Sequence, residues 1–127
     1  MAPATEQASP GGTSRRVFVV EDEIMIRMLL EDMLADLGYG VAASAGGLNE
    51  AMILAKESEF DLAILDVNLN GDPVYPVADL LMQRGVPFAF STGYGERGLP
   101  EPYRGRPTLQ KPFQLENLES ILTTIAR

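Results

Sequence analysis

The chain alternates short, continuous apolar runs with longer stretches in which apolar residues recur every three or four positions. A continuous run is typical of a strand buried on both faces, whereas the wider spacing predicts an amphipathic helix. The pattern predicts five strands, at residues 17–20, 39–44, 61–65, 86–90 and 108–110. It predicts four helices, at residues 24–37, 48–57, 76–83 and 115–126. The second strand is the least apolar, so we expect it at a sheet edge.

This order of strands and helices predicts one doubly wound α/β domain with a five-stranded parallel sheet, because the connections are long enough for right-handed crossovers. The length of 127 residues, 46% of them hydrophobic, fits a single domain with a core of its own. We assign the domain to residues 15–127. Residues 1–14 are rich in Ala, Pro, Ser, Thr and Gly, and we expect them to form a disordered tail.

The stretch from residue 93 to 107 departs from this rhythm. It contains Pro100, Pro102 and Pro107 among four glycines, and its apolar residues show no helical spacing. Proline inside a helix costs roughly 3 kcal/mol. We therefore expect a loop or one unstable turn where a helix would otherwise join the last two strands. We also expect this stretch to be mobile, since no apolar stripe would hold it against the core.

Polar residues follow four of the five predicted strands. They are Glu21 and Asp22 after the first, Asp66 after the third, Thr92 after the fourth and Lys111 after the fifth. Parallel strands end at the same edge of a sheet, and open α/β sheets hold their ligands there. Grouped carboxylates suit a hard divalent cation, and a lysine with a hydroxyl would remain to hold phosphoryl oxygens.

Composition narrows the possible functions. The chain has no cysteine and no histidine, which excludes disulfides, zinc sites and mechanisms that need imidazole or thiolate. The formal charge of −8 argues against nucleic acids and anionic membranes as partners. No apolar run has the length of a membrane span, and the N-terminus lacks the layout of a signal peptide. We expect a cytoplasmic monomer.

From about Arg15 onward the sequence resembles response-regulator receiver domains. The family places an acidic pair after strand one, a phosphoacceptor aspartate after strand three, Ser or Thr after strand four and Lys-Pro after strand five. The matching positions are Glu21, Asp22, Asp66, Thr92, Lys111 and Pro112. The resemblance implies a flavodoxin-like sheet with strand order 2-1-3-4-5 and a cis Lys-Pro peptide.

Residues 90–95, Phe-Ser-Thr-Gly-Tyr-Gly, are similar to the signature of the FAT GUY branch of this family, in which the fourth helix is reduced or disordered. The aromatic residue that many receiver domains carry three positions before the lysine is absent, because Thr108 stands there. The familiar switch, in which a hydroxyl moves toward the phosphate and an aromatic ring follows it, therefore cannot be transferred whole.

The resemblance implies a role for each matched residue. Asp66 would accept a phosphoryl group from a phosphohistidine, since the histidine nitrogen is a good leaving group when a cation neutralises the charge. Asp22 would bind Mg²⁺ directly, Glu21 through a water molecule, and the backbone carbonyl of Asn68 would add an oxygen. We assign Thr92 and Lys111 to the phosphoryl oxygens in the same way.

Plainer interpretations exist for these residues. Asp66 could end its strand and cap the next turn, Thr92 could be a turn residue, and Lys111 could be a solvated surface lysine. The acidic run at residues 21–23 could serve the N-terminus of the following helix, which we accept for Glu23 alone.

The implied function is a single-domain response regulator, not an enzyme, that acts as a switch, a relay or a phosphate sink. A histidine kinase or a histidine phosphotransfer protein would phosphorylate it, and the downstream protein is unknown. One alternative is a receiver-like binding module that is never phosphorylated. Another is an Asp-based phosphohydrolase, which usually needs a second carboxylate where this chain has Asn68. Most methionines fit core positions, whereas Met25 is a candidate for contact with the kinase.

Overall fold

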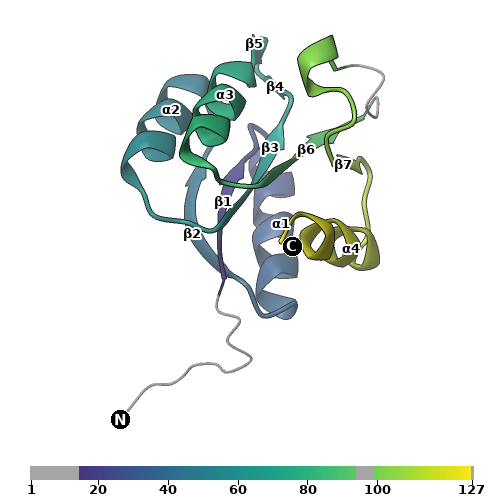
Figure 1. Ribbon diagram of the computed structural model, residues 1–127. Coiled ribbons are helices and arrows are strands. Elements are labelled where there is room, and N and C mark those ends of the chain that lie inside the picture. Colours follow the sequence, from purple (N-terminus) through teal and green to yellow (C-terminus); the bar gives the residue numbers. More distant parts are fainter. Residues whose placement is uncertain (1–14, 94–98, 127) are drawn as a thin grey trace.

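The computed structural model describes residues 15–93 and 99–126 (Figure 1). The expected N-terminal tail, residues 1–14, lies outside the described residues. The elements are β1 (Arg16–Val20), α1 (Ile24–Asp36), β2 (Gly40–Ala45), α2 (Leu48–Glu57), β3 (Leu62–Asp66), β4 (Asn68–Leu69), β5 (Asp72–Pro73), α3 (Tyr75–Arg84), β6 (Phe88–Thr92), the 3-10 helix η4 (Glu101–Tyr103), β7 (Thr108–Gln110) and α4 (Leu115–Ile125).

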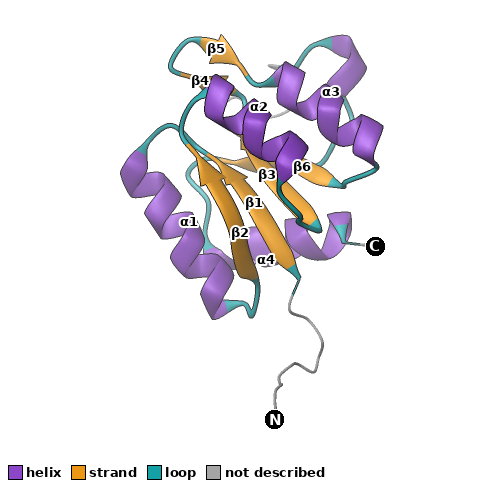
Figure 2. Ribbon diagram, turned by 90° about the vertical axis from the view of Figure 1, so that its left-hand side faces the viewer, coloured by secondary structure: helices purple, strands orange, loops and turns teal. Residues whose placement is uncertain are grey.

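Five strands form one parallel sheet in the order β2-β1-β3-β6-β7. Because β6 and β7 are the fourth and fifth strands of this sheet, the predicted order 2-1-3-4-5 is confirmed. The least apolar strand, β2, lies at an edge as expected. Helices α2 and α3 cover one face of the sheet, and α1 and α4 cover the other (Figures 1 and 2).

The core consists of two apolar layers, one on each face of the sheet. Phe18, Leu65 and Phe90 belong to the layer under α2 and α3. Ile64 and Ala89 belong to the layer under α1 and α4. Neighbouring strand residues thus enter opposite layers, which explains why the strands read as continuous apolar runs. Burial on both faces fixes the register, and with it the positions of the residues that follow each strand.

A small hairpin, β4–β5, follows the central strand, and the sequence pattern predicts only its turn. Asn70 and Gly71 both adopt positive φ, 55° and 95°, as a tight hairpin requires and as Asn-Gly favours. The Gly71 N–H donates to Asn68 Oδ1 at 2.6 Å. The hairpin holds the turn beside the end of β1, where the Asn70 N–H donates to Asp22 Oδ2 at 2.9 Å.

The stretch between β6 and β7 contains no α-helix within its described part, and η4 is a single turn. The expectation of a reduced fourth helix is confirmed. The expectation that nothing anchors this stretch is wrong for residues 99–107, because Leu99 and Tyr103 are buried. The Tyr103 ring stacks on Tyr75 with 4.9 Å between centroids, and it meets the Phe90 ring edge-on at 5.6 Å. Residues 94–98 lie outside the described part.

Candidate functional site

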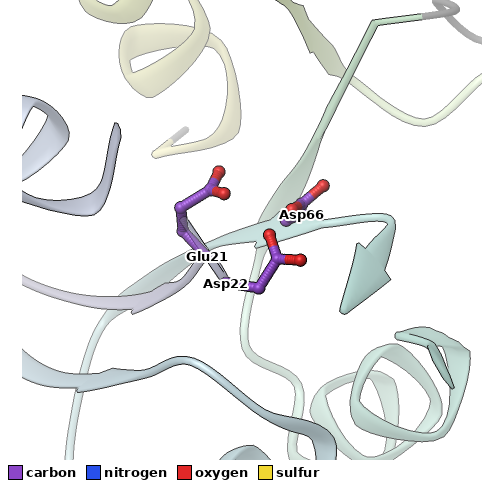
Figure 3. A group of neighbouring side chains, drawn as sticks. All are labelled: Glu21, Asp22 and Asp66. Atoms are coloured by element: carbon purple, nitrogen blue, oxygen red, sulfur yellow. The ribbon is translucent and has the colours of Figure 1, made fainter. Parts of the chain in front are cut away.

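Three carboxylates meet at the carboxyl edge of the sheet. Glu21 and Asp22 directly follow β1, and Asp66 is the last residue of β3 (Figure 3). One carboxylate oxygen of each lies within 4.8 Å of the others. Glu21 is 1% exposed and Asp66 is 6% exposed, while Asp22 is half-buried. The cluster predicted from the ends of these strands therefore forms.

Lys111 reaches this cluster from the end of β7. Its Nζ lies 2.9 Å from Glu21 Oε1 and 3.5 Å from Asp66 Oδ2. The interpretation of Lys111 as a solvated surface lysine is therefore wrong. Burial would lower the pKa of Lys111, but the bond to Glu21 and the charge of Asp66 raise it above its usual value. The peptide between Lys111 and Pro112 is cis, as the resemblance implies.

Backbone groups fix the acidic pair. The Glu21 N–H donates to Ala45 O at 3.0 Å, and the Glu23 N–H donates to Glu21 Oε2 at 3.0 Å. Glu23 itself is exposed at the N-cap of α1 and makes no side-chain capping bond. The Asn70 bond to Asp22 is a contact that sequence reasoning missed, although the Asn-Gly turn was its visible signal.

The cluster holds more negative charge than one ammonium group balances. Burial, the charge of Glu21 and a hydrogen bond with Asp22 raise the pKa of Asp66 from 3.8 to about 7, while Lys111 opposes the rise. Burial would also raise the pKa of Asp22, but hydrogen bonds with Asp66 and the Asn70 N–H lower it. Near neutral pH the site thus readily takes up a proton or a cation.

Thr92 ends the strand next to β3, and Asn68 lies two residues after Asp66. Thr92 is the last residue of β6 and is buried, and its carbonyl accepts a bond of 2.9 Å from the Lys111 N–H. This bond ties the ends of β6 and β7 together. Asn68 begins β4, and its side chain is engaged by Gly71, so only its backbone carbonyl fits the ligand role expected of it.

An apolar surface lies beside the site on α1. Its exposed members include Met25, 83% exposed, and Met28, 57% exposed, together with Ile24 and Leu29. The expectation that most methionines fit core positions fails for Met28 and also for Met82 on α3, which is 40% exposed. Next to this surface lies a pocket of about 260 Å³ lined by Ile26, Leu29, Lys111, Pro112 and Phe113.

Within the described residues, no helix is long and apolar enough to cross a membrane.

The fold and the site define a doubly wound α/β domain with an acidic cluster and a lysine at the carboxyl edge of its sheet. Residues 17–123 match the family model of the response regulator receiver domain, and the chain belongs to this family.

Relatives agree with this assignment. The transcriptional regulatory protein PdtaR of Mycobacterium tuberculosis is 35% identical over 108 residues, which are 82% of this chain and 53% of PdtaR. The chain spans about half the length of the curated relatives that it matches first. SdrG of Sphingomonas melonis Fr1 has a similar structure, with a TM-score of 0.80 and 35% identity over 89% of this chain and 97% of SdrG.

The receiver domain of PhyR from Erythrobacter litoralis is similar as well, with a TM-score of 0.79 and 30% identity over 91% of this chain and 92% of that domain. The SdrG and PhyR likenesses are consistent with the FAT GUY resemblance. The chain is thus a receiver domain of the response-regulator family. Receiver domains bind Mg²⁺ in their acidic site and interact with histidine kinases or phosphotransfer proteins.

Proposed function

We propose that Asp66 accepts the phosphoryl group. The observation that carries this proposal is the position of Lys111 Nζ, which contacts both Glu21 and Asp66 and so brings one positive charge to the face that a phosphoryl group would approach. A carboxylate at a buried strand end, beside a cation, is placed to attack phosphorus and to have the new charge neutralised.

Mg²⁺ fits the acidic cluster because every available donor is an oxygen. Asp22 and Asp66 would bind the ion directly, Glu21 through a water molecule, and the Asn68 carbonyl would complete the protein ligands. The bound ion supplies charge neutralisation for phosphoryl transfer. Glu21 also contacts Lys111, so the lysine brings a second positive charge to the same cluster.

Thr92 and Lys111 would hold two oxygens of the phosphoryl group, because they end adjacent strands and face the same edge. The domain of residues 15–127 would act as a switch, a relay or a phosphate sink, as a monomer in the resting state. A pure binding module has no use for a half-buried lysine shared by two carboxylates. An Asp-based phosphohydrolase usually needs a second carboxylate two residues after its nucleophile. This chain has Asn68 at that position, which argues against a phosphohydrolase.

The test is phosphorylation by acetyl phosphate with Mg²⁺, followed by intact mass. The wild-type protein should gain one phosphoryl group, and Asp66→Asn should gain none, because an amide is a poor nucleophile. The matched control is Asp32→Asn, which removes an exposed carboxylate of α1 and should be labelled at the wild-type rate. Full-rate labelling of Asp66→Asn would overturn the proposal.

We also propose that a histidine kinase contacts Met25 on the exposed surface of α1. A panel of the host's histidine kinases would first identify the phosphodonor protein. Met25→Lys should then slow transfer from that kinase but leave labelling by acetyl phosphate unchanged. Ile53→Lys, at a similarly exposed position of α2, is the control and should transfer normally. Equal transfer to both variants would remove Met25 from the contact.

A further inference from the structure

Ser91, in β6, has no part in the site as described above. Its side chain is 2% exposed. Among the described residues, 15–93 and 99–126, its Oγ is the one buried side-chain nitrogen or oxygen with no hydrogen-bond partner. A buried hydroxyl without a partner destabilises the fold, because it loses its bonds to water and gains none in return. Packing alone therefore does not explain a serine at this position.

The strand register places Ser91 beside Asp66. The two residues are direct partners in the parallel pairing of β3 and β6, and paired residues project to the same face. Ile64 and Ala89, two positions earlier in these strands, lie in the layer under α1 and α4, so Ser91 and Asp66 face that side. Neighbouring strands are about 4.8 Å apart, which puts the hydroxyl within one side chain's reach of the Asp66 carboxyl group.

Lys111 begins from the same face of the sheet. Ser91 is paired on its other side with Leu109 of β7, two residues before Lys111. The lysine extends from there to Glu21 and Asp66, and its Nζ lies 3.5 Å from Asp66 Oδ2. Asp66 also shares a hydrogen bond with Asp22. In the resting protein, therefore, other groups already engage the Asp66 oxygens.

Phosphorylation would change these partners. The new phosphoryl oxygens carry more charge than the acyl oxygen that remains on Asp66, so they attract Lys111 away from it. We propose that the Ser91 hydroxyl then donates a hydrogen bond to this acyl oxygen and shortens the life of the phosphorylated state. The inference rests on the proposed function, since it requires a phosphoryl group on Asp66.

The direction of the effect follows from the hydrolysis step. The oxygen of a water molecule bonds to phosphorus, and the bond between phosphorus and the Asp66 oxygen breaks. The electron pair of that bond stays on the carboxylate, and the protons of the water pass to phosphate and solvent. Charge therefore builds up on the Asp66 oxygens in the transition state, where a bond from Ser91 is stronger than in the acyl phosphate.

The experiment measures the phosphoryl lifetime in Ser91 variants. Each protein is phosphorylated with acetyl phosphate, the donor is removed, and loss of the phosphoryl group is followed with Mg²⁺ present. Ser91→Ala should lengthen the half-life roughly three- to tenfold, the factor that one net hydrogen bond contributes. Ser91→Thr keeps a hydroxyl and should return the half-life toward the wild-type value. Ser120→Ala removes an exposed hydroxyl of α4 and should change nothing.

Infrared difference spectra test the hydrogen bond directly. A purely structural role of Ser91 would leave the acyl carbonyl band of phosphorylated Asp66 unchanged. A hydrogen bond lowers the stretching frequency of the acyl carbonyl, so this band should lie higher in Ser91→Ala and return in Ser91→Thr. An unchanged or shortened half-life in Ser91→Ala, or an unchanged carbonyl band, would overturn the inference about Ser91. The proposed function would still stand in that case, provided that the wild-type protein is labelled. A wild-type protein that takes up no phosphoryl group would overturn both.

Discussion

Two regions of opposite character meet at the carboxyl end of β6. On one side lies the acidic cluster of Glu21, Asp22 and Asp66, balanced only in part by Lys111. On the other side lies an aromatic cluster, which we define as Tyr75, Phe90 and Tyr103. Its ring centroids are 4.9–6.1 Å apart, in stacked and edge-on contacts. The first region is dominated by charge and the second by packed aromatic rings.

The difference shows how the domain divides stability from function. Crowded carboxylates destabilise the metal-free fold, as the raised pKa of Asp66 indicates. The aromatic cluster stabilises it, and it attaches the stretch after Thr92 to α3 without an α-helix in the described part. Residue Phe90, two positions before Thr92, belongs to this cluster, so the two regions share one strand.

The largest expected effect concerns the aromatic cluster. Tyr103→Ala should lower the free energy of unfolding by about 3 kcal/mol, because it leaves a cavity between Tyr75 and Phe90. Urea unfolding measures the change. Glu101→Ala, at an exposed position of the same 3-10 turn, is the control and should cost little. A loss below about 1 kcal/mol for Tyr103→Ala would mean that these rings do not hold the segment.

The next effect concerns the acidic cluster. Asp22→Asn should weaken Mg²⁺ binding by about 10- to 100-fold, because a charged ligand becomes neutral. The same substitution should slightly lower the stability of the metal-free protein, because the lowered pKa of Asp22 means that the fold stabilises its carboxylate. Titration followed by backbone amide shifts measures the affinity, and Asp32→Asn should bind like the wild type. Equal affinities in Asp22→Asn and the wild type would remove Asp22 from the metal site.

A smaller effect appears as a dependence on pH. The pKa of Asp66 rises from 3.8 to about 7 on folding, so between these values the folded state keeps a proton that the unfolded chain has released. Stability of the metal-free protein should therefore fall as pH rises through about 7. The fall should be about 1–2 kcal/mol larger in the wild type than in Asp66→Asn, after allowance for solvent screening.

Urea unfolding with a chelator, at about pH 5 and about pH 8.5, measures this difference. Comparison with Asp66→Asn cancels the titration of other groups. If stability depends on pH in the same way in both proteins, the pKa of Asp66 is not raised by folding. The acidic cluster would then not destabilise the metal-free fold, contrary to the comparison of the two regions.

The smallest expected effect separates two contributions of Tyr103 to stability, the packing of its ring and the hydrogen bond of its hydroxyl group. Tyr103 donates a hydrogen bond to Asp79 of α3, and burial with this contact raises the pKa of Tyr103 to about 12. Tyr103→Phe keeps the ring, so it should cost only about 0.5–1 kcal/mol. If Tyr103→Phe lowers the free energy of unfolding as much as Tyr103→Ala does, the hydrogen bond to Asp79 stabilises the segment and the ring contacts do not.

The residues at strand ends could be predicted because parallel strands with continuous apolar runs leave little freedom in register. Asp66, Glu21 and Lys111 therefore meet where their positions in the sequence imply. The Asn-Gly turn was visible in the sequence, but its bond from Asn70 to Asp22 was not, because that bond depends on where the hairpin lies in space. Tyr103 escaped notice for a similar reason, since a single ring held by partners on α3 and β6 produces no periodic pattern.

The bond network of Lys111 has a consequence for how the chain assembles. The acidic residues after β1 and β3 precede Lys111 in the chain, so any arrangement of β1, β2, β3 and β6 that lacks β7 would hold its carboxylates without their counter-charge. Docking of β7 then brings both apolar burial and the missing ammonium group. The functional residues thus help to recruit the last strand, and the site is complete only when the sheet is.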